Sequence, residues 1–502
     1  MHTPRTIGEA LQRGAALWPD AVYAVAVDGA GSITHAELLR EAAVVAAQLH
    51  ELGLRVGDTV SLVMPNGLHT LRCLLGAMAS GLVVNPVNLL SQPEQMRYVL
   101  GHSDCKLVIT TVEWEARVRE HLATLDRQVT LQVSDAHAPA PAAGAFDWPA
   151  VEPQAVALLM YTSGTTGQPK GVMLTQANLV ANALAIAHEH ALTRSDRVLA
   201  VLPLFHINAF AVTMLAPLLS GGSLALPPRF SSGRFWEQVA QAQCTWINLV
   251  PTMISFLLEG EVPPRTTSAA LRFCRSASAA LPPEHLRGFE QRFGVGVIET
   301  MGLTETVAPC FSNPLDATQR KLGSVGRASG CEARVIDAQL QPVPDGTTGE
   351  LAMRGANVML GYYKNAEATA ASFTPDGWLR SGDLGHRDAD GFFFVTGRIK
   401  ELIIKGGENI APREIDEALL AHPAVLDAAA VGIPDRHYGQ EILACVVLRE
   451  GHSCSEDELR TFSEAKLGRY KTPKQFRFLS ELPRGPSGKV QRLRLLDDLP
   501  SL

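Results

Sequence analysis

The sequence predicts an α/β protein with a large N-terminal domain and a small α+β C-terminal domain. A chain of 502 residues is too long for one simple core, so at least two domains are expected. In its first third, short apolar runs alternate with segments whose apolar residues recur at helical spacing. This alternation favours a largely parallel sheet. The pattern changes near residue 330, where Gly and Asp turns join short strand-like runs, and again near residue 398, where helical patterns return.

The first elements can be followed along the chain. Residues 34–53 carry apolar positions at helical spacing and end on Gly53, a typical stop signal for a helix. Residues 59–66 predict a short buried strand and residues 68–81 the helix after it, with further strands over 105–110 and 155–162. Residues 134–153 are rich in Ala and Pro, which indicates a surface loop rather than a domain boundary.

The second half contains two patterns. Residues 332–337, 349–355 and 391–398 predict the short strands of a β-rich subdomain. Beyond them, helix-like runs over 413–423 and 456–468 flank strand-like runs over 425–435 and 441–450. We therefore predict domains at 1–397 and 398–502, without an internal repeat.

Composition narrows the class of protein. Hydrophobic residues make up 46% and charged residues 19%, and the net charge of −7 argues against a nucleic-acid partner. The eight cysteines form no CxxC pair, which favours reduced thiols in a cytoplasmic protein. The N-terminus has no apolar core of the signal-peptide type, and the most apolar later stretch falls short of the ~20 residues that a spanning helix needs. A cytoplasmic enzyme without a membrane span is expected.

The stretch "YTSGTTGQPKGVMLT" (residues 161–175) concentrates hydroxyls, glycines and Lys170 directly after a predicted strand. Backbone N–H groups, hydroxyls and a lysine suit phosphate oxygens, and glycine lets the backbone approach closely. The stretch is not a Walker loop, because Gln168 and Pro169 precede Lys170 and Gly171 follows it. Taken alone, it fits a phosphate-binding loop and a polar surface turn equally well.

The stretch resembles the signature loop of the acyl-adenylate-forming (AMP-binding) superfamily. Six further segments lie in the order of that family: "PLFHINA" at 203–209, "RSASAALP" at 275–282, "MGLTET" at 301–306, "GWLRSGDLG" at 377–385, "GRIKELIIKGGENIAPREIDEAL" at 397–419 and "PRGPSGKVQR" at 483–492. The resemblance covers nearly the whole chain. It points to the acyl-CoA synthetase branch, with likeness to oxalate–, carnitine– and coumarate–CoA ligases.

The resemblance implies a fold and a reaction. The large domain would consist of layered αβα subdomains plus the β-rich subdomain, and the small domain would be mobile. A carboxylate would attack the α-phosphate of ATP and release pyrophosphate, and the thiol of CoA would then displace AMP. Cofactors are therefore ATP, Mg²⁺ and coenzyme A, and the partners are a small-molecule carboxylic acid and CoA. A homo-oligomer and a monomer both stay open.

The resemblance also assigns the nucleotide site. Thr304 would contact phosphate, Glu305 would act in catalysis as the magnesium ligand, Asp383 would accept both ribose hydroxyls, and Arg398 would reach ribose or phosphate. A carboxylate suits Mg²⁺, which prefers hard oxygen ligands. Further cofactor contacts are expected from the loop, from the adenine pocket and from a C-terminal turn: Thr162, Ser163, Gly164, Thr165, Thr166, Gly167, Lys170, Ala277, Met301, Lys405, Gly406 and Gly407.

In the C-terminal domain, Lys489 would be the catalytic cation that bridges carboxylate and α-phosphate. Lys400 stands at the hinge position of the family. Rotation about it would deliver Lys489 for adenylation and then bring Lys405 to Gly407 toward the thiol channel.

The acyl pocket is expected to include His206, Asn208, Arg275, Ser276 and Ser278. His206 is read as a gate or pocket wall, with a core histidine as the alternative. Arg275 is read either as the partner of a second acidic group on the substrate or as a structural arginine under the pocket.

The segments around 203–209 and 275–282 favour a small, polar or acidic carboxylic acid as the substrate. A medium-chain or aromatic acid, and a standalone enzyme that loads a carrier protein, are the alternatives. Three departures from the family pattern stand out: Met301 replaces the usual aromatic residue beside adenine, Gln176 replaces a frequent His, and Ala277 and Ala280 replace Gly and Pro.

Overall fold

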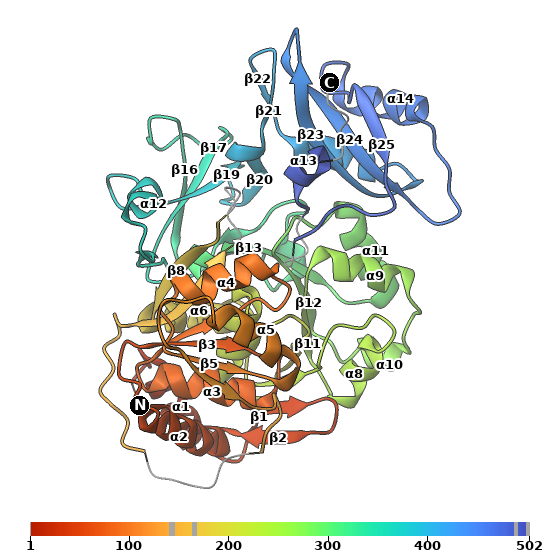
Figure 1. Cartoon of the computed structure of the whole chain (residues 1–502). Helices are drawn as coiled ribbons and strands as arrows, with labels where there is room; N and C mark the ends of the chain where they lie inside the picture. Colours follow the sequence, from red (N-terminus) through yellow and green to blue (C-terminus); the bar gives the residue numbers. More distant parts are fainter. Residues whose placement is uncertain (1, 140–145, 163–167, 486–489, 498–502) are drawn as a thin grey trace.

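The computed structural model describes residues 2–139, 146–162, 168–485 and 490–497. In these residues the chain forms a large N-terminal part built on three sheets and a small C-terminal part built on a fourth (Figure 1). The predicted α/β class, with a β-rich subdomain and an α+β C-terminal part, is confirmed. No helix among the described residues has the length and apolar character needed to cross a membrane.

A seven-stranded sheet has the order β18-β8-β7-β4-β3-β5-β6. Its strands from β7 to β6 are parallel, whereas β8 and β18 are added antiparallel at one edge. The strands span β3 (Thr59–Val63), β4 (Val83–Pro86), β5 (Leu107–Thr110), β6 (Thr130–Val133), β7 (Val156–Thr162), β8 (Lys170–Thr175) and β18 (Gly361–Tyr362). The strands predicted near 59–66, 105–110 and 155–162 are all present.

A nine-stranded sheet has the order β15-β14-β13-β12-β11-β9-β10-β1-β2. Its strands from β13 to β1 are parallel, so their carboxyl ends meet at one edge. The strands span β1 (Val22–Ala26), β2 (Gly31–Thr34), β9 (Arg197–Leu199), β10 (Ser223–Leu226), β11 (Trp246–Leu249), β12 (Phe273–Ser276), β13 (Val297–Leu303), β14 (Ala308–Ser312) and β15 (Arg327–Ala328).

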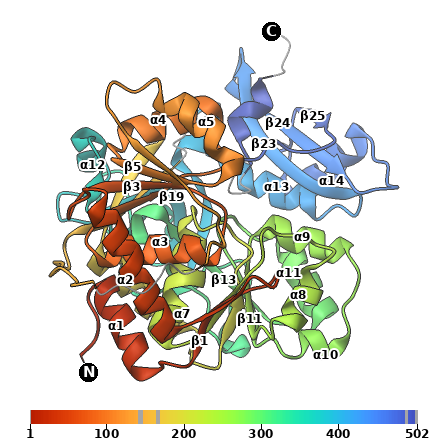
Figure 2. The ribbon, with the colours of Figure 1, turned by 60° about the horizontal axis from the view of Figure 1, so that its bottom comes forward.

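Helices form a layer between these two sheets and cover their outer faces. In the shared layer, α3 contacts β4 of one sheet and β1 of the other, and α6 contacts β7 and β8 as well as β14. Figure 2 shows α3 between the sheet that contains β3 and β5 and the sheet that contains β1 and β11. This layer holds α1 (Ile7–Leu17), α2 (His35–Glu51), α3 (Leu68–Ala79), α6 (Gln176–Glu189), a π-helix (Asn208–Leu215) and α7 (Ala216–Ser220). The outer helices are α4 (Pro93–His102), α5 (Val112–Leu122), α8 (Phe235–Gln241), α9 (Pro251–Glu259), α10 (Arg265–Ser268) and α11 (Pro283–Phe293).

Local sequence signals set the start of several helices. Thr34 caps α2: its hydroxyl accepts from Glu37 N at 3.2 Å, and the Glu37 carboxylate accepts from Thr34 N at 2.9 Å. Such a capping box satisfies two N–H groups that a helix start leaves unpaired. Pro412 opens α13 (Pro412–Leu420), where its fixed φ and missing N–H cost nothing.

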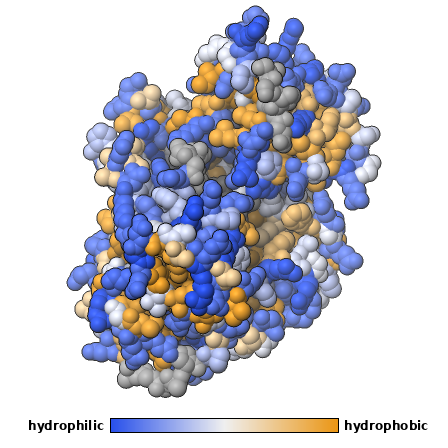
Figure 3. All heavy atoms as spheres, viewed as in Figure 1, coloured by the Kyte–Doolittle hydropathy of each residue, from blue (hydrophilic) through white to orange (hydrophobic). Residues whose placement is uncertain are grey.

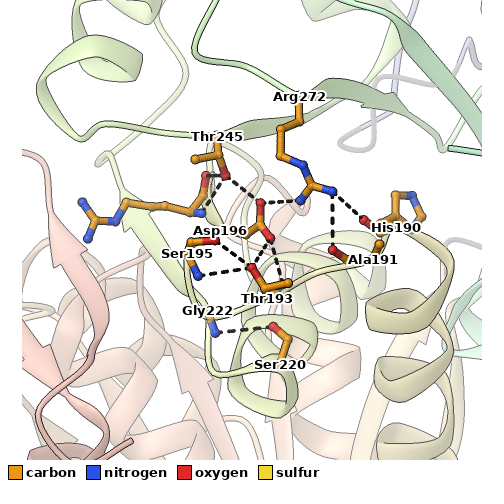
Figure 4. Close-up of polar contacts among 10 residues, drawn as sticks. His190, Ala191, Thr193, Ser195, Asp196, Ser220, Gly222, Thr245 and Arg272 are labelled. Carbon is orange, nitrogen blue, oxygen red and sulfur yellow. Dashed lines mark hydrogen bonds and ion pairs between the residues drawn. The ribbon is translucent and has the colours of Figure 1, made fainter. Parts of the chain in front are cut away.

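A buried carboxylate ties together the strand starts of the nine-stranded sheet, opposite the carboxyl edge (Figure 4). Asp196 is 4% exposed; it pairs with Arg272 at 2.5 Å and accepts from Thr193 N at 2.8 Å and from the Thr245 hydroxyl at 3.1 Å. Because these residues precede β9, β11 and β12, the cluster holds the starts of three neighbouring strands in register.

The β-rich subdomain is a four-stranded antiparallel sheet of order β16-β17-β19-β20. It comprises β16 (Glu332–Ile336), β17 (Gly349–Arg354), β19 (Leu379–Arg387) and β20 (Phe393–Arg398), with α12 (Ala366–Ala371) beside it. The three segments predicted as strands of this subdomain are found in β16, β17 and β20.

The C-terminal part has a five-stranded sheet with α13 and α14 on one face. Separate apolar cores fill its two faces. Its elements are β21 (Ile403–Lys405), β22 (Glu408–Ile410), α13 (Pro412–Leu420), β23 (Val425–Asp435), β24 (Gly439–Leu448), α14 (Glu456–Leu467) and β25 (Gln475–Phe478). Only a short 3-10 turn, Ile399–Glu401, separates β20 from β21.

Candidate active site

The candidate site lies at the carboxyl edge of β11, β12 and β13. The β-rich subdomain lies beside this edge, and so does the β7–β8 hairpin that carries the segment 161–175. In the hairpin, β7 and β8 pair antiparallel with Thr162 opposite Lys170. The Lys170 ammonium lies 4.7 Å from the ring centroid of Tyr362. The remaining predicted loop residues lie outside the described residues: Ser163, Gly164, Thr165, Thr166 and Gly167.

Thr304 and Glu305 lie in a 3-10 turn, Thr304–Thr306, between β13 and β14. The turn is tight because Gly302 comes so close to β14 that an added Cβ would lie 2.1 Å from the carbonyl oxygen of Ala308. Glu305 is half-buried, and its Oε1 accepts a hydrogen bond from the Tyr362 hydroxyl at 2.7 Å. Among the described residues its Oε2 accepts no hydrogen bond, so that oxygen is available to a ligand.

Asp383 and Arg398 are cross-strand partners on β19 and β20. Asp383 is 5% exposed, and its Oδ1 accepts from Arg398 Nε at 2.5 Å. Burial alone would lower the pKa of Arg398, but Asp383 together with Glu401 and Glu305 raises it. Glu305 is therefore close enough to act on Arg398, which brings the predicted magnesium ligand and the predicted ribose residues into one site.

A buried acid shapes the turn that precedes Asp383. Glu350 on β17 is 6% exposed; its Oε2 accepts from Arg380 Nε at 2.9 Å and Nη2 at 2.7 Å, and its Oε1 accepts from Gly382 N at 2.9 Å. Gly382 has φ of +72°, a left-handed conformation that favours glycine. Glu350 thus fixes the backbone next to Asp383.

Arg275 lies in a buried network of amides. It is 1% exposed, and its Nη1 donates to Asn208 Oδ1 at 2.8 Å and to Asn248 Oδ1 at 2.9 Å. Asn208 Nδ2 in turn donates to the Ser278 hydroxyl at 3.2 Å. Among the described residues no carboxylate pairs with Arg275, its Nε has no hydrogen-bond partner, and burial lowers the pKa of its guanidinium to about 9.

The other predicted pocket residues lie around this network. Asn208 begins the π-helix, an irregular element that is frequent at functional sites. Ser278, half-buried with φ of +75°, and buried Ala277 follow β12, and the buried hydroxyl of Ser276 has no partner in the described chain. His206 is half-buried, with its ring 4.7 Å from that of Phe205.

Met301 is half-buried on β13 and packs against the main core. Its carbonyl oxygen accepts from the Cys310 thiol at 3.6 Å. The place that the family gives to an aromatic ring is therefore held by a partly exposed thioether. Gln176, the second departure, is fully buried and structural: its Oε1 accepts from Ile7 N at 3.0 Å and its Nε2 donates to Met78 O at 2.7 Å.

Residues assigned to the second half-reaction are held within the C-terminal part. Lys405 is 6% exposed; it pairs with Glu441 at 2.9 Å and donates to Tyr470 O at 2.9 Å. Gly406 and Gly407, at φ of +55° and +86°, form the tip of the β21–β22 hairpin, which points away from the N-terminal part in Figure 1. The structure does not bring these residues to Asp383 or Glu305.

Two predicted residues remain, the hinge residue Lys400 and the lysine Lys489 to which a catalytic role was assigned. Lys400 is exposed within the Ile399–Glu401 turn that links the two parts. Lys489 lies outside the described residues. The surface is hollowed beneath the C-terminal part (Figure 3). A cavity of about 240 Å³ is lined by Gln92 from the N-terminal part and by Arg484 and Gly485 from the C-terminal part.

Glu299 lies where the C-terminal part covers the site. It is 8% exposed on β13, and burial raises the pKa of its carboxyl group to about 7, against the opposing effect of Arg413 from α13. Arg413 also donates to Val395 O at 2.6 Å, which fastens α13 to β20.

Three residues of the site were missed by the sequence reasoning: Asn248, Tyr362 and Glu350. Asn248 is a polar residue within the apolar run of β11, a signal that could have singled it out. Tyr362 and Glu350 lie in short strands whose pattern predicted structure only.

Comparisons with known proteins match this chain to one enzyme family over nearly its whole length. The family model of the AMP-binding enzyme matches residues 11–363, and the model of the AMP-binding enzyme C-terminal domain matches residues 414–489. A sulfoacetate–CoA ligase of Cupriavidus necator is 58% identical over 489 residues, which cover 96% of each chain. An oxalate–CoA ligase of Arabidopsis thaliana is 36% identical over 503 residues, which cover 97% of each.

Solved structures also match along the whole chain. The crystal structure of ATP-bound MatB from Rhodopseudomonas palustris has a TM-score of 0.89 at 29% identity, and apo MatB has 0.81; both alignments cover 98% of each chain.

Proposed function

Since this chain belongs to the AMP-binding enzyme family and is an AMP-forming acid–CoA ligase, we propose that its substrate is a small carboxylic acid with a second anionic group. Sulfoacetate and oxalate, named for two relatives, belong to this class. The chain uses ATP and CoA, as its family does.

The environment of Arg275 carries this proposal. A buried guanidinium is costly unless an anion or a full set of acceptors compensates it. Here two amide oxygens engage one nitrogen, Nε is left without a partner in the described chain, and no acid pairs with the charge. A bound sulfonate or second carboxylate at Asn208 and Ser278 would supply the missing negative charge.

The same network disfavours the alternative acids. A medium-chain or aromatic acid needs an apolar pocket wall, and burying such a chain beside Arg275, Asn208 and Asn248 would leave the buried guanidinium without an anion. The aliphatic and aromatic alternatives are therefore expected to be poor substrates.

We also propose roles for the charged residues, which the family resemblance supports and, for the described residues, the geometry supports as well. Adenylation brings a carboxylate onto a phosphate, so cations must be in place beforehand. Lys170 and Lys489 are assigned to phosphates and to the reacting anions, and Asp383 to the ribose, with Arg398 holding its carboxylate. The available Oε2 of Glu305 fits a magnesium ion, which prefers carboxylate oxygen. Bound Mg²⁺ would neutralise phosphate charge.

The arrangement of the two parts supports an adenylation-competent orientation. The chain is more similar to MatB with ATP than to apo MatB, with TM-scores of 0.89 and 0.81. Under this proposal the domains divide at 1–397 and 398–502, and Lys400 is the pivot that later brings Lys405 to Gly407 toward CoA. The cytoplasmic location stays a prediction, and the oligomeric state stays open between a monomer and a homo-oligomer.

A pyrophosphate-release assay over a panel of acids tests the proposal. Sulfoacetate, oxalate and malonate should give the highest kcat/KM, well above propionate, octanoate and coumarate. A preference for octanoate or coumarate would contradict it.

A further inference from the structure

Strand β18 joins the two phosphate-handling segments of the site. Its two residues pair with β8, Tyr362 opposite Val172, and the flanking Tyr363 N donates to Gly171 O at 2.7 Å. On the other side, Met359 N donates to Glu305 O at 2.8 Å. The backbone around Tyr362 is thus bonded both to the strand that begins with Lys170 and to the turn that holds Glu305.

The side chain of Tyr362 repeats this connection. It is 9% exposed, its ring lies 4.7 Å from the Lys170 ammonium, and its hydroxyl donates to Glu305 Oε1 at 2.7 Å. A cation over an aromatic face is attracted by the ring quadrupole. A hydrogen bond to a carboxylate is stronger than one between neutral groups. Here it engages Oε1 of Glu305 and leaves Oε2 available to a ligand.

From these contacts we infer that Tyr362 is a positioning residue that orients Glu305 toward the metal of Mg·ATP and holds Lys170 at the phosphates. By occupying Oε1, its hydroxyl presents Oε2 as the single available ligand oxygen. By placing its ring beside Lys170, it limits the rotamers of a long side chain that would otherwise have to be ordered when ATP binds. The inference rests on the roles proposed above for Glu305 and Lys170.

The chain offers a matched control at the next position. The Tyr363 hydroxyl donates to Asp104 Oδ2 at 2.8 Å, and Asp104 also pairs with Lys364 at 2.6 Å. Tyr363→Phe removes the same atom as Tyr362→Phe, from the same short segment, without touching Glu305.

The test is ATP binding measured by titration calorimetry, in Mg²⁺ and in EDTA, without acid or CoA. Tyr362→Phe should weaken binding about tenfold in Mg²⁺ and less than twofold in EDTA, because the ring stays beside Lys170 while Glu305 loses its donor. Tyr363→Phe should match the wild type in both media. Tyr362→Leu should weaken binding in EDTA as well, since the lysine loses its ring.

A double-mutant cycle separates positioning from packing. In a Glu305→Gln background, adding Tyr362→Phe should change Mg²⁺-dependent binding less than twofold. Tyr362→His, which keeps a ring and a donor, should restore part of the Mg²⁺ effect. It replaces Tyr362→Phe as the test variant if Tyr362→Phe has a lowered melting temperature.

The inference is overturned if Tyr362→Phe binds Mg·ATP like Tyr363→Phe, if its losses in Mg²⁺ and EDTA are equal, or if its loss adds fully to that of Glu305→Gln. The measurement contains no acid, so a wrong choice of substrate class leaves its outcome unchanged.

Discussion

Replacing Arg275 by Met gives a sharp test of how the second anionic group is recognised. Met keeps an unbranched apolar stem, is shorter than Arg, and removes the charge from the Asn208–Ser278 network. An anion bound at those two residues would lie about 6 Å from the guanidinium, and at an effective dielectric constant of about 20 their attraction is about 3 kcal/mol. We therefore expect kcat/KM for sulfoacetate to fall about 100-fold.

The comparison substrate is methylsulfonylacetate, which keeps the size of sulfoacetate but carries no second charge. Its kcat/KM in the Arg275→Met variant should change less than threefold, measured by pyrophosphate release. Arg275→Lys, which keeps a charge but loses the planar fork, should retain part of the preference. The melting temperature is measured alongside, because Met removes a buried charge that has no paired acid but leaves the amide oxygens of Asn208 and Asn248 without the Arg275 donor. Equal losses for the two substrates would refute the reasoning and leave Arg275 as a structural residue.

Four further predictions concern the half-reactions and stability. Lys489→Ala should abolish acyl-adenylate formation but spare thioester formation from supplied acyl-adenylate; equal loss in both would contradict its role. Lys400→Pro should do the reverse, since proline fixes φ at the hinge, and unchanged turnover would show that the pivot lies elsewhere. Asp196→Ala should lower the free energy of unfolding by about 3 kcal/mol in urea titrations, because Arg272 and the neighbouring donors lose their acceptor; a loss below about 1 kcal/mol would argue against the cluster as a stabilising unit. Burial raises the pKa of Glu299 to about 7, so the folded state holds its proton more tightly and stability declines as pH rises through this value. Glu299→Gln should then stabilise the fold at pH 8 by up to about 3 kcal/mol and not at pH 4, and an equal gain at both values would show that titration is not the cause.

Much of the fold could be predicted from the sequence, because the relevant signals are local. The apolar runs at 59–66 and 105–110 have the length of buried strands, and both became strands of a largely parallel sheet. The capping residues of α2 likewise lie three positions apart in the chain. Pairing of β18 with β8 joins residues far apart in sequence, and no local pattern indicates it.

Only part of the candidate site could be predicted from the sequence. Residues within family motifs, such as Glu305 and Asp383, could be assigned by resemblance. Asn248 and Tyr362 make their contacts across the fold, so their place in the site depends on which strands become neighbours. The sequence left two interpretations of Arg275 open, since a strand residue can face either side. The structure adds that this side chain is buried without a paired acid among the described residues.

A competition experiment tests the central claim most directly. Purified protein is given ATP, Mg²⁺, limiting CoA and an equimolar mixture of sulfoacetate, oxalate, propionate, octanoate and coumarate, and the acyl-CoA products are identified by mass spectrometry. We predict that the CoA thioester of a dianionic acid dominates, with AMP and pyrophosphate formed in equal amounts. Predominant octanoyl-, propionyl- or coumaroyl-CoA would contradict the account.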